Sequence, residues 1–190
     1  MKLIILAMVM FFATAQGGEL KGVRLDDQRT FNEYPLVLNS MGIRHVQRFG
    51  FDIKVYIAGL YLSEKSKESK SIIDSDTPKW IVMEFVRNVD RKPLIDGWRK
   101  SLKAACLQCE VSMEKLKTFN KFMVNMRTGN KIEVGFLKDK VVLDVKARSN
   151  SHVDIESSAF SKDLLAVFIG EKNPADKRLR EGLLGIREEK

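Results

Sequence analysis

The residues from Gly42 to Leu62 constrain the fold most, because they have the pattern of two long strands joined by a tight turn. In the second half, from Phe51 to Leu62, odd positions carry Phe, Ile, Val, Ile, Gly and Tyr, and even positions carry Asp, Lys, Tyr, Ala, Leu and Leu. An alternation of period two indicates a strand with two different faces. β-branched and aromatic residues, which strands prefer, dominate it. The sequence therefore predicts a long β-hairpin.

The expected register of this hairpin follows from its loop. We expect a three-residue loop, Phe49–Phe51, with Gly50 at positive φ. The expected cross-strand pairs are Gly42–Ala58, Arg44–Tyr56 and Arg48–Asp52 on one face, and Ile43–Ile57 and His45–Val55 on the other. A slip by one residue would place Arg44 opposite Val55 and mix the two faces.

Arg44 beside Tyr56 is the candidate binding site. A cation and a phenol on neighbouring strands, with small residues around them, can hold an anionic oxygen. The alternative is a surface arginine packed on a tyrosine, and the spacing leaves both interpretations open.

The composition indicates one globular domain in a chain of 190 residues with a net charge of +8. A basic balance suits an anionic ligand, a membrane surface or a nucleic acid. No nucleic-acid-binding motif accompanies it, so we expect no nucleic-acid partner. Motifs for serine hydrolysis, nucleotide binding and zinc proteolysis are missing from the sequence.

The first residues, Met1–Ala15, form a short apolar run after one lysine and end in Ala-Thr-Ala. This pattern is typical of a secretory signal peptide, and the run is too short for a membrane-spanning helix. The sequence predicts a signal peptide over residues 1–15, a single domain over 16–190 and a bacterial periplasmic or secreted location. No segment of the mature chain is long enough to span a membrane.

Cys106 and Cys109 are the only cysteines and form a Cys-x-x-Cys pair. In an oxidising compartment such a pair favours a structural disulfide, with free thiols as the next interpretation. A redox-active pair or half of a metal site is also compatible with the spacing. The two histidines, His45 and His152, lack ligand spacing to this pair, so we expect no metal and no cofactor.

The remaining patterns predict an α+β fold, an open-faced sandwich with a large antiparallel sheet and helices packed mainly on one face. We expect Leu20–Leu25 and Leu36–Leu38 to extend the sheet beside the hairpin. Further strands are expected at 80–86, 131–137 and 141–146, and helices at 71–74, from Asp90, at 112–126, 159–169 and 174–184.

Several of these segments resemble the chalcone isomerase-like family, and most closely its exported bacterial members. The resemblance rests on GIR followed by VYIAGLYL, on FVRNVDRKPLIDGW and on FSKDLLAVFIGEKNPADKRLREGLLG, in the family's order. It implies the open-faced sandwich fold. It also places Arg44 on the family's catalytic or ligand-holding arginine, and Tyr56 where the plant enzymes carry a threonine.

The same resemblance argues against catalysis. The family's catalytic tyrosine falls near Lys92-Pro93, and the late threonine or serine of its flavonoid pocket falls near Val167. These residues lack the hydroxyl groups that the chemistry needs. We expect a non-catalytic periplasmic binder of a small amphipathic acid, such as a fatty acid. The alternatives are an intramolecular lyase or isomerase of the chalcone isomerase type, acting on an enone, and a scaffold without a ligand. The sequence leaves the oligomeric state open.

Overall fold

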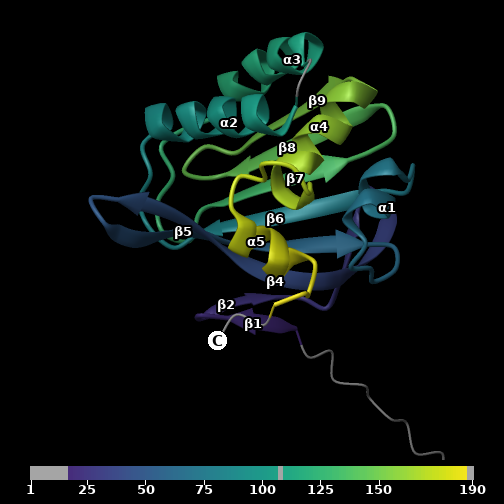
Figure 1. Ribbon diagram of the computed structural model, residues 1–190, viewed down its shortest axis with the longest axis horizontal. Coiled ribbons are helices and arrows are strands. Elements are labelled where there is room, and N and C mark those ends of the chain that lie inside the picture. Colours follow the sequence, from purple (N-terminus) through teal and green to yellow (C-terminus); the bar gives the residue numbers. More distant parts are fainter. Residues whose placement is uncertain (1–16, 107–108, 188–190) are drawn as a thin grey trace, which may run out of the picture.

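A curled antiparallel sheet of seven strands forms the centre of the fold. The computed structural model describes residues 17–106 and 109–187, so the expected signal peptide, Met1–Ala15, lies outside the described residues. The strands follow one another in chain order, each paired with its sequence neighbour (Figure 1). They are β3 (Gln28–Phe31), β4 (Tyr34–Arg48), β5 (Phe51–Leu62), β6 (Lys79–Phe85), β7 (Lys131–Phe136), β8 (Lys140–Lys146) and β9 (Ser151–Glu156). Strand β9 was not predicted.

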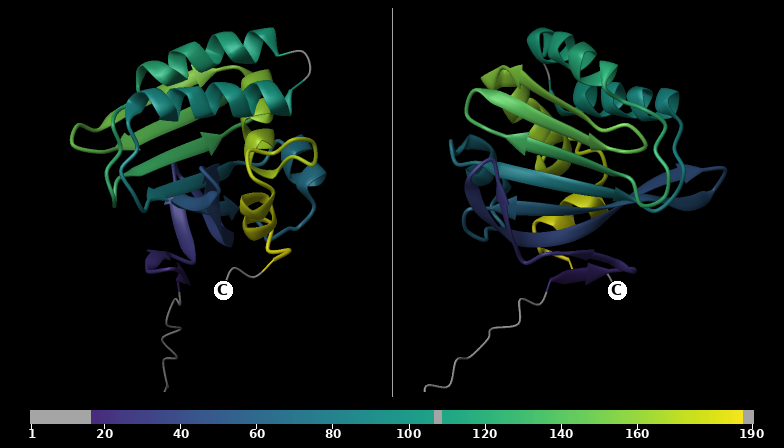
Figure 2. Two further views of the ribbon diagram at one scale, coloured as in Figure 1. Left: turned by 60° about the vertical axis from the view of Figure 1, so that its left-hand side comes forward. Right: turned by 180° about the vertical axis from the view of Figure 1, so that it is seen from behind.

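Helices cover one face of this sheet (Figure 2). They are α1 (Ser69–Asp74), α2 (Arg91–Ala105), α3 (Glu110–Lys121), α4 (Ser158–Ile169) and α5 (Lys177–Leu183). Helix α4, apolar around most of its surface, packs against α2, α3 and strands β7 and β8, and forms the centre of the main core. The predicted fold class, with helices on one face of a large antiparallel sheet, is confirmed.

The opposite face carries a second, smaller core under a short hairpin. Strands β1 (Gly18–Leu20) and β2 (Val23–Leu25) form their own two-stranded sheet and cover Tyr61 and Trp80. The expectation that they extend the main sheet is therefore wrong. A tight turn at Lys21-Gly22 folds β1 and β2 on each other, and their apolar side chains are buried on the sheet's second face instead of at its edge.

The central hairpin has the predicted register in its body and a different one at its tip. Arg44 pairs with Tyr56, and the Gly42–Ala58 and Ile43–Ile57 pairs are also as expected. The expected Arg48–Asp52 and His45–Val55 pairs are wrong. The loop has two residues, Phe49 and Gly50, both at positive φ, which pairs Arg48 with Phe51 and His45 with Lys54.

A β-bulge reconciles the two registers, with Val55 as the extra residue between Lys54 and Tyr56. A bulge lets two residues of one strand oppose one of the other and turns the strand locally. Because of it, Ile53 pairs with Val46 and takes the place on the helix-covered side that the expected register gave to Lys54. A second irregularity at Asn39 lets that side chain bind the carbonyl of Leu183 and the N–H of Ser66.

The helix termini differ from the expectations in detail. Helix α2 begins after Asp90 as predicted, but the N–H of Arg91 is bound by the side chain of Asn125. Helix α3 ends at Lys121, and the chain beyond it forms a bridge between Met126 and Val89. Helix α5 begins at Lys177, after an Asp176 N-cap, and not at Pro174.

The cysteine pair is oxidised. Cys106 at the end of α2 and Cys109 at the start of α3 form a disulfide, with Cα atoms 5.7 Å apart. The predicted pairing is therefore present, and it lies at the corner between the two helices.

Candidate functional site

A cleft of about 420 Å³ lies between the sheet and helix α2. Strands β4 and β5 form one wall, and the other comes from α2, the residues before it, α4 and the segment before α5. The lining residues are Arg44, Val46, Arg48, Ile53, Val55, Tyr56, Arg87, Asn88, Val89, Asp90, Pro93, Leu94, Gly97, Trp98, Lys100, Ser101, Val167 and Ala175.

The deeper part of the cleft is apolar. Leu94 and Trp98, one turn apart on α2, are buried, as is Val167 on α4. The Trp98 ring makes edge contacts with Phe119 and Phe168 behind it, with centroids 5.3 and 5.7 Å away. These contacts fix the ring, so this wall offers an apolar surface of defined shape.

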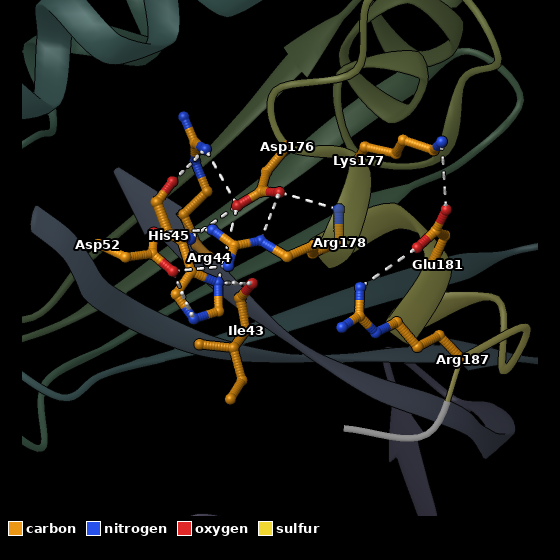
Figure 3. Close-up of polar contacts among 9 residues, drawn as sticks. All are labelled: Ile43, Arg44, His45, Asp52, Asp176, Lys177, Arg178, Glu181 and Arg187. Carbon is orange, nitrogen blue, oxygen red and sulfur yellow. Dashed lines mark hydrogen bonds and ion pairs between the residues drawn. The ribbon is translucent and has the colours of Figure 1, made fainter. Parts of the chain in front are cut away.

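Arg44 is the more buried of the two arginines on the strand wall, and its side chain is 20% exposed. Its Nη1 donates to the carbonyl oxygen of His45 at 2.6 Å and lies 3.4 Å from Oδ2 of Asp176 (Figure 3). Both contacts use Nη1. The guanidinium has five donor hydrogens, and those on Nη2 and Nε make no hydrogen bond to the described residues.

Asp176 joins strand β4 to helix α5. Its Oδ2 accepts the N–H of His45 at 2.7 Å, and its Oδ1 accepts the N–H of Arg178 at 2.9 Å as the helix N-cap. Helix α5 lies against β4 because two glycines, Gly42 and Gly182, allow close contact. The packing of α5 thus brings a carboxylate to Arg44.

Tyr56 lies beside Arg44 and is buried. Burial raises the pKa of Tyr56 to about 12, an effect that the charge of Asp176 strengthens and that of Arg44 opposes. The phenol is therefore protonated at neutral pH and can donate a hydrogen bond.

Cations dominate the rim. Arg48, Arg87 and Lys100 are exposed, and Asp90 is the one acid among the lining residues. Within the part of the chain that the structure describes, Arg87 and Lys100 form no ion pair. The rim therefore attracts anions.

The structure thus brings the predicted residues Arg44 and Tyr56 into one cleft. Pro93 and Val167, at the positions where the resemblance implies catalytic or pocket hydroxyls, also line it and supply none. The cysteine pair does not line the cleft. Sequence reasoning missed Asp176, although an aspartate before a helix is a typical N-cap signal.

Two further observations concern only residues 17–106 and 109–187. These residues contain no cluster of three or more His, Cys, Asp or Glu side chains that could hold a metal ion. None of the helices described has the length and apolar character needed to cross a bilayer.

The fold and the cleft define a class of small α+β proteins with an arginine in an amphipathic cleft between an antiparallel sheet and its helices. The chain belongs to the chalcone isomerase-like family, whose model matches residues 17–185. No curated protein matches the chain.

A solved structure with a similar fold is that of a fatty-acid binding protein from Arabidopsis thaliana. The two chains are 17% identical, and the match covers 86% of this chain and 92% of the other, with a TM-score of 0.67. At this identity the likeness concerns the fold.

Proposed function

We propose that the protein binds a small amphipathic acid, such as a fatty acid, in the cleft beside α2. The observation that carries the proposal is the Arg44–Tyr56 pair on the wall of a cleft of about 420 Å³ whose deeper part is apolar. Cavities for small ligands have volumes of about 300–1,000 Å³ and combine apolar walls with a few polar groups.

The free donors of Arg44 set the geometry for the ligand's head group. With Nη1 occupied by His45 and Asp176, the Nη2 and Nε hydrogens remain for a carboxylate, which can accept two parallel hydrogen bonds. The protonated Tyr56 hydroxyl can donate a third. A hydrogen bond to a charged group contributes about 1.5–3 kcal/mol when shielded from water.

The tail would supply most of the affinity. Each methylene that leaves water contributes about 0.8 kcal/mol, so an acyl chain of about a dozen carbons gains on the order of 10 kcal/mol before the costs of binding. Leu94, Trp98 and Val167 offer the apolar surface for it. Arg44 and Tyr56 then determine orientation and head-group preference.

Two observations support binding over an intramolecular lyase activity. The Arabidopsis thaliana protein with a similar fold is a fatty-acid binding protein. In this chain, Pro93 and Val167 line the cleft without a hydroxyl group that could polarise an enone.

We also propose that a bacterial cell exports the protein and removes Met1–Ala15. The Cys106–Cys109 disulfide supports an oxidising compartment, because cytosolic thiols are usually kept reduced. Intact-mass measurement of the exported protein tests this, and a mature chain that retains Met1 would contradict it.

The binding proposal is tested by titrating delipidated protein with a long-chain fatty acid and with the alcohol of the same length. We expect Arg44→Ala to weaken acid binding by about ten- to a hundredfold, or 1.4–2.8 kcal/mol, and alcohol binding much less. Tyr56→Phe should act in the same direction but more weakly.

Arg99→Ala is the matched control, because Arg99 is an exposed arginine of α2 outside the cleft. It should leave both affinities unchanged. Equal losses for acid and alcohol in Arg44→Ala would mean that Arg44 only shapes the cleft. No detectable binding of any long-chain acid to the wild type would refute the proposed function.

A further inference from the structure

The β4–β5 hairpin continues beyond the sheet as a two-stranded arm. The arm consists of Val46–Lys54, where the two strands pair only with each other (Figure 1). Strand β3 pairs with β4 only as far as Val37, and β6 pairs with β5 from Tyr56 onward. The arm therefore projects from the domain as a two-stranded ribbon.

Two aromatic side chains stand at the end of this arm. Phe49 and Phe51 are 87% and 73% exposed, the highest values among the large hydrophobic residues that the structure describes. Isolated exposed apolar residues are ordinary on protein surfaces, but two phenylalanines at the tip of a projecting hairpin form a small apolar head.

Phe49 lies in the turn with a backbone conformation that is unfavourable for its residue type. Phe49 has a φ of 52° and Gly50 a φ of 78°. A left-handed conformation is unfavourable for a bulky residue, and such turns prefer asparagine or aspartate before glycine. Since Phe49 packs against no core, folding gives no reason for a phenylalanine at this position.

The charge around the tip is positive. Arg48 places its guanidinium 5.4 Å from the centre of the Phe49 ring, and Lys54 is exposed at the base of the arm. The one acid of the arm, Asp52, is neutralised by two hydrogen bonds from Arg178, at 2.6 and 2.7 Å. The arm thus combines aromatic rings at its tip with two cations, Arg48 and Lys54, that form no ion pair with the described residues.

The arm is also a wall of the cleft. Val46 and Ile53 of the arm line it together with Val55 next to the arm, and the bulge at Val55 places Ile53 on the helix-covered side. Phe51 precedes Ile53 by two residues and shares its face of the strand. An apolar surface therefore runs from the tip of the arm into the cleft.

From these observations we propose that the arm docks on an anionic lipid bilayer, with Phe49 and Phe51 inserted between the head groups. Apolar side chains beside lysine and arginine bind the interface of such membranes. The docked arm would connect the bilayer to the cleft along Ile53 and Val55. This passage of the ligand rests on the proposed function, but the docking itself does not.

The size of the tip favours a bilayer over a protein partner. A stable protein interface buries about 800 Å² on each side, whereas one phenylalanine buries about 150–250 Å². Two rings on a narrow ribbon therefore provide too little area for such an interface, but they are sufficient to enter a fluid surface.

The first experiment measures the binding of the protein, with its N-terminus established by intact mass, to sedimented vesicles. One set contains phosphatidylcholine alone, and the other contains equal parts of phosphatidylcholine and phosphatidylglycerol. We expect binding to the second set, and its weakening by salt. A wild type that binds neither set of vesicles overturns the proposal.

The decisive variant is the double substitution Phe49→Asn and Phe51→Thr. Asparagine before Gly50 suits a turn with two positive φ angles, and threonine suits a strand, so the hairpin should be retained. We expect vesicle binding to fall about tenfold or more, since each buried phenylalanine contributes strongly to transfer from water.

The exposed Val111 and Ile186 provide the control, as Val111→Thr with Ile186→Thr should leave vesicle binding unchanged. Equal losses in both double variants would overturn the proposal.

A charge variant and a solution measurement complete the test. Lys54→Gln should weaken binding to the anionic vesicles about fivefold, while Lys65→Gln, an exposed lysine away from the arm, should not.

Fatty-acid affinity in solution should be equal in wild type and the Phe49→Asn, Phe51→Thr variant, because neither phenylalanine lines the cleft. If the wild type binds vesicles but no fatty acid, docking stands and the proposed function fails. If it binds fatty acid but no vesicles, the proposed function stands and the docking proposal fails.

Discussion

Gly42 on β4 and Gly182 on α5 are in direct backbone contact. A Cβ atom on Gly182 would lie 2.6 Å from the Cα of Gly42, and one on Gly42 would lie 2.6 Å from the carbonyl oxygen of Leu179. Any side chain at either position would push the helix away from the strand. This contact holds α5, and with it Asp176, beside Arg44 (Figure 3).

We therefore expect Gly42→Ala to destabilise the protein. Overpacking of a close contact costs about 1–3 kcal/mol, and chemical denaturation measures it as a lower midpoint. Gly97→Ala is the control with the opposite sign: its Cβ would meet nothing within 4 Å, and alanine in a helix is about 0.5–1 kcal/mol more stable than glycine. A Gly42→Ala variant as stable as the wild type would show that α5 is not held by this contact.

Asp176→Asn should strengthen binding of the acid ligand. The substitution removes the negative charge 3.4 Å from Arg44 Nη1, and asparagine is as good an N-cap as aspartate. We expect the dissociation constant for a fatty acid to fall about three- to tenfold, or roughly 0.7–1.4 kcal/mol, with that of the alcohol unchanged.

Asp96→Asn, an exposed acid of α2 outside the cleft, should leave both constants unchanged. If Asp176→Asn weakens the acid and the alcohol alike, the role of Asp176 is to hold α5 in place and not to balance the charge of Arg44.

The buried Tyr56 should make the protein sensitive to alkaline pH. Its folded-state pKa is about 12, above that of an unfolded tyrosine at about 10, so the unfolded chain releases this proton first. The contribution of Tyr56 is fully present below about pH 10 and is lost as the pH rises toward 12.

Tyr56→Phe should remove about 3 kcal/mol of that alkaline loss, because the shift is about two pKa units and each unit corresponds to about 1.4 kcal/mol. Urea denaturation at several pH values measures the effect. Tyr34→Phe, at a 42% exposed tyrosine, should leave the pH dependence as in the wild type. An identical alkaline slope in wild type and Tyr56→Phe would mean that Tyr56 ionises normally.

Chalcone cyclisation should not be accelerated. Pro93 and Val167 line the cleft at the positions where the family resemblance implies hydroxyl groups, and the chemistry needs these groups in place together. Incubation of a hydroxychalcone with the protein should give the uncatalysed rate. Faster cyclisation that disappears in Arg44→Ala would show the expectation to be wrong.

The body of the central hairpin could be predicted from the sequence, but its tip could not. Alternating residues identify the two faces of β5, and this was sufficient to pair Arg44 with Tyr56. The two-residue turn at Phe49-Gly50 and the compensating bulge at Val55 were missed. Turns with positive φ usually carry asparagine, aspartate or glycine, so Phe49 does not indicate such a turn. The extra residue at Val55 brings Tyr56 back opposite Arg44, and the alternation of residues in the sequence does not reveal it.

The sequence by itself determined the α+β class, the hairpin and the pairing of Arg44 with Tyr56, because strand periodicity, helix caps and the ordered family motifs are local patterns. Only the tertiary structure decided what surrounds Arg44. Asp176 accepts the N–H of His45 from 131 residues away, and that distance closes only because Gly42 and Gly182 let α5 pack on β4. The same holds for the cleft, since α2 packs on α4, α4 packs on α5, and α5 packs on β4 of the hairpin. Contacts of this kind depend on shape at two distant points of the chain, and no local pattern contains them.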